Sequence, residues 1–78
     1  MLSFEIKKSV EGKLPDELEV ILDDEGLDTL LAQLRFLKER RTEHVHLMSE
    51  SWGGTHLDDH ASRVGNAAIH HVEILLRG

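Results

Sequence analysis

The 78 residues suffice for one hydrophobic core and not for two, so we expect a single domain over residues 1–78. The absence of cysteine excludes disulfides and cysteine-based zinc sites, and it favours a reducing, cytoplasmic location. Fifteen acidic against nine basic side chains give a net charge of −6, which argues against binding nucleic-acid phosphates. We also expect no signal peptide and no membrane partner, because the chain has neither a signal-type N-terminus nor an apolar run of membrane-spanning length.

The first part of the chain predicts a β-hairpin. Leu2, Phe4 and Ile6 alternate with polar residues, which is the period-two pattern of a half-buried strand. Residues 9–17 include a glycine and a proline among polar residues and predict a loop. Residues 18–22 are rich in strand-forming side chains, so these two strands are expected to pair antiparallel.

A helix is expected to follow and to run to about Arg41. Asp23 or Asp24 can cap its first turn, where negative charge suits the helix dipole. Basic residues near its end suit the opposite pole, so we do not read them as a nucleic-acid site. Leucines recur at helical spacing and form an apolar stripe, interpreted as facing the core rather than a partner. The stripe consists of Leu27, Leu30, Leu31, Leu34 and Leu37.

Two further strands are expected in the second half, over residues 44–48 and 69–76, joined by a long connection over residues 49–64. The element order β-β-α-β-β predicts an α+β fold, a four-stranded mixed sheet with one helix packed on one face. A right-handed crossover through the helix would make the second and third strands parallel.

Because one helix covers only one face of a sheet, strand alternation divides the side chains into two sets. The covered set comprises Phe4, Ile6, Val20, Leu22, Val45, Leu47, Val72 and Ile74. The uncovered set comprises Glu5, Lys7, Glu19, Ile21, His44, His46, Met48, His71, Glu73 and Leu75. An apolar strip of Ile21, Met48 and Leu75 within a polar rim is typical of an interface. A solvated face and a homodimer remain the alternatives.

The sole tryptophan, Trp52, precedes two glycines that permit a tight turn. It either closes the end of the core, which we favour, or anchors an interface. The candidate partner-binding residues are therefore Glu5, Glu19, Ile21, His44, His46, Met48, Trp52, His71 and Glu73.

Metal binding and catalysis are weaker hypotheses. His44 and His46 share a strand face, and His71 with Glu73 could lie opposite them, which would suit zinc. The pattern lacks a defined metal-ligand spacing, so we assign no metal and no cofactor, and cross-strand hydrogen bonding is the alternative role. The serines lack the setting of a nucleophile elbow, so we expect no enzyme and assign no catalytic residue.

Several segments resemble the small immunity proteins of bacterial polymorphic-toxin systems, specifically immunity protein family thirty-two. They are Leu22-Asp23-Asp24-Glu25-Gly26-Leu27, Leu30-Leu31-Ala32-Gln33-Leu34, His44-Val45-His46-Leu47-Met48-Ser49 with Trp52-Gly53-Gly54, and His70-His71-Val72-Glu73-Ile74. The resemblance covers nearly the whole chain and is most specific between His44 and Gly54. It implies a cytoplasmic antidote that binds a cognate toxin domain and blocks it by occlusion. An acidic domain suits that role, because carboxylates can stand in for the phosphates that a basic toxin binds.

Overall fold

The computed structural model describes residues 1–8 and 17–78, so most of the predicted loop lies outside the described residues. Strand β1 (Leu2–Lys7) pairs antiparallel with β2 (Leu18–Leu22). This confirms the predicted pairing of the first two strands.

Helix α1 (Asp24–Lys38) begins where the sequence predicts. The side chain of Asp23 accepts a hydrogen bond from the Gly26 backbone N–H at 2.8 Å, which satisfies one of the unpaired donors of the first turn. The helix ends at Lys38 rather than near Arg41, because Arg40 adopts the left-handed conformation with φ 58°. The backbone N–H of Arg41 then bonds back to the Phe36 carbonyl at 3.0 Å, which closes a Schellman motif.

The remaining elements are β3 (His44–Met48), the short 3₁₀ helix η1 (Glu50–Trp52), β4 (Asn66–Ala68) and β5 (His71–Leu75). They do not complete a single sheet. Within the described residues, β2, β1 and β4 form one sheet in that order, and β3 pairs with β5 in a separate two-stranded ribbon. All of these pairs are antiparallel.

The predicted four-stranded mixed sheet is therefore not confirmed, although the α+β class is correct. The expected fourth strand, over residues 69–76, corresponds to β5, and β4 is an additional strand that the sequence did not predict. β4 pairs with β1, and the chain then leaves that sheet so that β5 pairs with β3. The predicted parallel pairing of β2 and β3 is wrong, because α1 leads from one sheet to the other instead of returning to its own. β4 is a short edge strand, and its three residues pair only with β1.

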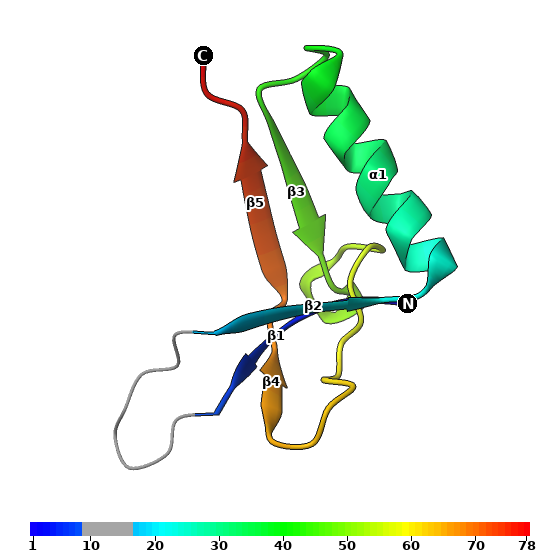
Figure 1. The fold of residues 1–78 in the computed structure, drawn as a ribbon, viewed down its shortest axis with the longest axis vertical. Helices are drawn as coiled ribbons and strands as arrows, with labels where there is room; N and C mark the ends of the chain where they lie inside the picture. The colour runs from blue at the N-terminus through cyan, green and yellow to red at the C-terminus, as the bar shows by residue number, and fades with distance from the viewer. Residues whose placement is uncertain (9–16) are drawn as a thin grey trace.

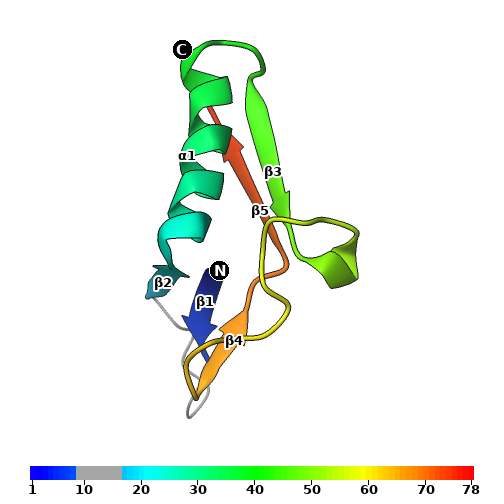
Figure 2. The ribbon, with the colours of Figure 1, turned by 90° about the vertical axis from the view of Figure 1, so that its right-hand side faces the viewer.

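The two sheets lie across each other. In Figure 1 the ribbon β3–β5 runs beside α1, while β1 and β2 cross below it. Figure 2 shows α1 on one side of the ribbon and the loop containing η1 on the other. The core lies where the two sheets meet, with Leu2, Phe4, Leu47 and Leu57 buried. No helix among residues 1–8 and 17–78 is long and apolar enough to span a membrane.

The leucine stripe of α1 is only partly core. Leu37 is buried and Leu30 packs against the core cluster, as expected. Leu27, Leu31 and Leu34 instead leave 40%, 45% and 39% of their surface exposed. A helix facing a two-stranded ribbon meets a narrower apolar surface than it would on a four-stranded sheet, so one side of its stripe is uncovered.

Strand β1 also departs from simple alternation, because residues on both of its faces are buried. Ser3 and Glu5 lie on the face expected to be open, yet both are inaccessible to solvent or nearly so. β1 is the central strand of its sheet, and Ser62, Arg63 and Asn66 donate hydrogen bonds to the Glu5 side chain. Val20 shows the opposite departure: it was assigned to the covered face, but it lies on an edge strand and is exposed.

Candidate functional site

The ribbon β3–β5 presents one face away from α1, which we call the histidine face: His44, His46, Met48, His71, Glu73 and Leu75. Three cross-strand pairs form it, His44 with Leu75, His46 with Glu73 and Met48 with His71. The residues between them, including Val45 and Leu47, point to the core. The alternation predicted for these two strands is thus confirmed.

Three imidazoles and one carboxylate converge at the centre of this face. His46 Nδ1 lies 2.7 Å from His71 Nε2, so one ring donates a hydrogen bond to the other. On its other side, His46 Nε2 lies 3.4 Å from a Glu73 carboxylate oxygen. The ring of His44 stands edge-on to that of His46, with centroids 5.0 Å apart. One imidazole, His46, therefore contacts all three other groups.

Trp52 adjoins the histidine face and does not close the core, so the favoured interpretation of this residue is wrong. Its side chain is 59% exposed, and its ring stacks on His70 with centroids 6.1 Å apart. The two glycines explain the placement. Gly53 has φ 86°, and an added Cβ on Gly54 would overlap the Met48 backbone, so only glycines let the chain turn this tightly against the end of β3.

The expected apolar strip is not continuous. Met48 and Leu75 share the histidine face but occupy its opposite ends, paired with His71 and His44 respectively. Four residues of strand separate the ends, about 13 Å. Ile21 belongs to the other sheet, where it pairs with Ser3. The histidine face therefore has a polar pair, His46 and Glu73, at its centre and one apolar side chain beside a histidine at each end.

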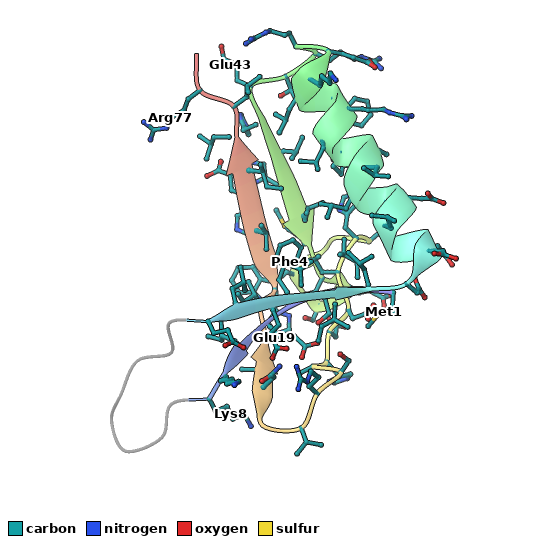
Figure 3. All side chains as sticks on the ribbon, in the orientation of Figure 1. Met1, Phe4, Lys8, Glu19, Glu43 and Arg77 are labelled. Carbon is teal, nitrogen blue, oxygen red and sulfur yellow. The ribbon has the colours of Figure 1, made fainter. Side chains whose placement is uncertain are left out.

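Two further candidates, Glu5 and Glu19, are not on this face. Glu5 has no exposed surface, so its side chain cannot contact a partner. Glu19 pairs across the strands with Glu5 and keeps only 17% of its side chain exposed. Its carboxylate forms an ion pair with Arg63 and accepts a hydrogen bond from the side-chain amide of Asn66 at 3.0 Å. Glu19 lies on β2, in the sheet that does not include β3 and β5, and Figure 3 labels it below that strand.

Glu5 is instead the centre of a buried hydrogen-bond network. Its carboxylate accepts from the Ser3 hydroxyl, from the Ser62 backbone N–H at 2.8 Å and hydroxyl at 2.9 Å, and from the Asn66 amide at 3.1 Å. Burial alone raises the pKa of this carboxyl, but the hydrogen bonds from Ser3, Ser62 and Asn66 outweigh it and lower the pKa to about 2. Because two of these partners lie 57 and 61 positions away along the chain, no local pattern could have revealed the network.

A serine, a histidine and an aspartate also meet near the end of β3, although not as a catalytic relay. The Ser49 hydroxyl lies 2.7 Å from His70 Nδ1, and an Asp59 carboxylate oxygen lies 3.9 Å from the same nitrogen. In a catalytic triad the serine and the acid are hydrogen-bonded to different nitrogens of the histidine ring, whereas here both lie beside Nδ1. Ser49 is moreover fully buried, so its hydroxyl has no access to a substrate.

The aspartate in this group has a structural role. The Asp59 carboxylate accepts a hydrogen bond from the Ser51 backbone N–H at 3.0 Å, which lowers the pKa of that carboxyl. It thereby ties the loop after η1 to η1 itself. Asp59 also lines a surface hollow of about 840 Å³, together with Glu50, Asp58 and His60. The hollow is rich in carboxylates, and among them the position of Asp59 is accounted for by its hydrogen bond with Ser51.

Comparison with protein-family models, with curated proteins and with solved structures finds no match to this chain.

Proposed function

We propose that this protein is an immunity protein that binds a cognate bacterial toxin domain and neutralises it by occlusion. The observation that supports this best is the histidine face, an uncovered ribbon surface that continues into the exposed Trp52. An exposed tryptophan beside a polar and apolar surface is typical of interface anchors, which bury a large rigid side chain at low entropic cost. The resemblance described above indicates the class of partner.

The charge of the molecule fits a basic partner. A net charge of −6 on 78 residues would speed encounter with a positively charged toxin surface and repel nucleic acid. Glu73 is the carboxylate of the histidine face and is 43% exposed, which leaves it free to meet a cationic side chain. Occlusion requires only such surface contacts, so the proposed role is binding rather than catalysis.

Co-expression with the product of the adjacent gene tests this proposal. We expect that product to be toxic alone, to be tolerated with this protein, and to form a complex with it. Trp52→Ala and Glu73→Lys should each weaken the complex at least tenfold, as expected for a central anchor and for a reversed charge in an interface. His46→Asp should weaken it as well.

Matched controls keep the test specific. Val64 is fully exposed on the loop before β4, so Val64→Ser removes an exposed apolar side chain away from the histidine face. Glu39→Lys reverses an exposed charge at the end of α1. Both variants should retain binding. A neighbour that is neither toxic nor bound would refute the proposed function, and binding unchanged by all three face variants would refute the proposed surface.

A further inference from the structure

The centre of the histidine face has a second property that does not depend on a toxin partner. We propose that His44, His46 and Glu73 bind a transition-metal dication, with zinc the best fit. One ligand atom from each residue lies within 4.8 Å of the others. The sequence alone assigned no metal here, although it grouped His44 and His46 with His71 and Glu73 as a set that would suit zinc. The geometry selects Glu73 rather than His71 as the third ligand.

The distances are close to those of a metal site. Zinc bonds of about 2.0–2.1 Å place the ligand atoms of a tetrahedron about 3.3 Å apart. His46 Nε2 and the Glu73 oxygen are already separated by 3.4 Å. No separation exceeds 4.8 Å, so none must shorten by more than about 1.5 Å to reach that geometry, which rotation of an exposed side chain such as His44 can supply.

His71 fits the role of an outer-sphere partner. Zinc-bound histidines donate their second ring N–H to a neighbouring acceptor, which fixes the ring orientation and leaves the other nitrogen free for the metal. In this structure the Nδ1 of His46 lies 2.7 Å from His71 Nε2, while its Nε2 faces Glu73. When His46 donates to His71, its Nε2 lone pair points at a carboxylate, and a cation between them relieves that repulsion.

The strands hold the proposed ligands in place. His46 and Glu73 are directly opposed in the register, and His44 lies two residues along the same face of β3. Two imidazoles and one carboxylate favour zinc and similar transition metals over magnesium or calcium, which prefer oxygen ligands. Three protein ligands on an exposed face leave the fourth position to water or to a group from another molecule.

Calorimetric titration of the purified, untagged and chelator-treated protein with zinc chloride tests this site. We expect one zinc per chain. His44→Ala and Glu73→Gln should each weaken binding at least tenfold, and His71→Ala should weaken it about tenfold as an outer-sphere loss. His60→Ala is the control, because His60 is an exposed loop histidine outside the site, and it should bind zinc as the parent does.

Cobalt(II) supplies a readout that needs no variant, since a tetrahedral complex absorbs visible light far more strongly than the hydrated ion. Absence of zinc binding, one zinc shared between two chains, or undiminished affinity in the His44→Ala/Glu73→Gln double variant would overturn the inference. Circular dichroism of each variant checks that the ribbon is intact. Because the titration uses the isolated protein, its failure leaves toxin binding untouched, and failure of toxin binding leaves the metal site untouched.

Discussion

Replacing Glu5 with glutamine should remove a large part of the stability of this domain. The carboxylate is fully buried and accepts hydrogen bonds from Ser3, Ser62 and Asn66. A glutamine side chain fills the same volume, but its NH₂ group is a hydrogen-bond donor. The groups that surround this position are donors too, so the NH₂ group cannot accept from them. At least one buried donor then loses its partner, which is the costly way to break a hydrogen bond.

The pKa of Glu5 sets the magnitude. It falls from 4.5 to about 2 on folding, a difference of about 2.5 units, and each unit corresponds to 1.36 kcal/mol. The ionised form of Glu5 therefore stabilises the fold by about 3 kcal/mol relative to the protonated form. A domain of 78 residues has a total stability of roughly 4–12 kcal/mol, so Glu5→Gln should leave a marginally stable protein.

The dependence on pH follows from the direction of the shift. A carboxyl whose pKa is lowered on folding contributes its full stabilisation above the unfolded pKa of 4.5. That contribution declines as the pH falls from 4.5 towards 2, where the folded group also takes up a proton. The Glu5→Gln variant lacks this titrating group, so its stability should fall less than that of the parent protein between pH 4.5 and pH 2.

Urea unfolding followed by circular dichroism at several pH values measures both effects. Glu43→Gln is the matched control, because Glu43 is exposed and its substitution makes the same chemical change. The stabilising role of Glu5 would be refuted if Glu5→Gln were as stable as the control at neutral pH. It would also be refuted if the two variants lost stability in parallel between pH 4.5 and pH 2.

Three further predictions concern α1 and are read from urea midpoints of the parent and each variant. Gly26→Ala should destabilise the fold by roughly 1–3 kcal/mol or more, because the new Cβ would overlap the Met1 carbonyl; an unchanged midpoint would contradict this close approach. Arg40→Gly should stabilise it by about 1 kcal/mol, because glycine adopts the left-handed conformation of Arg40 without steric cost, and a loss of stability would count against the Schellman ending. Leu37→Ala should cost about 2–5 kcal/mol and the half-exposed Leu34→Ala clearly less, so equal losses would show that the burial pattern is wrong.

Local pattern determined the elements of this protein. The alternation in residues 2–7 and 44–48 and the strand-forming side chains of residues 18–22 identified the first three strands, and the capping aspartate and the leucine spacing identified the helix. Such patterns succeed because secondary structure depends on neighbours a few residues apart. The same alternation grouped His44, His46, His71 and Glu73 on one face, since a ribbon has only two sides.

Only the tertiary structure decided how the strands combine. Alternation shows which side chains share a face, but it does not show which strand lies next to which. Alternation therefore could not predict that the strands form two sheets or that Glu5 is buried in contact with Ser62. Nor could it predict that Nε2 of His46 faces Glu73 rather than His71. Each of these depends on contacts between residues far apart in the chain, whose geometry exists only once the chain is folded.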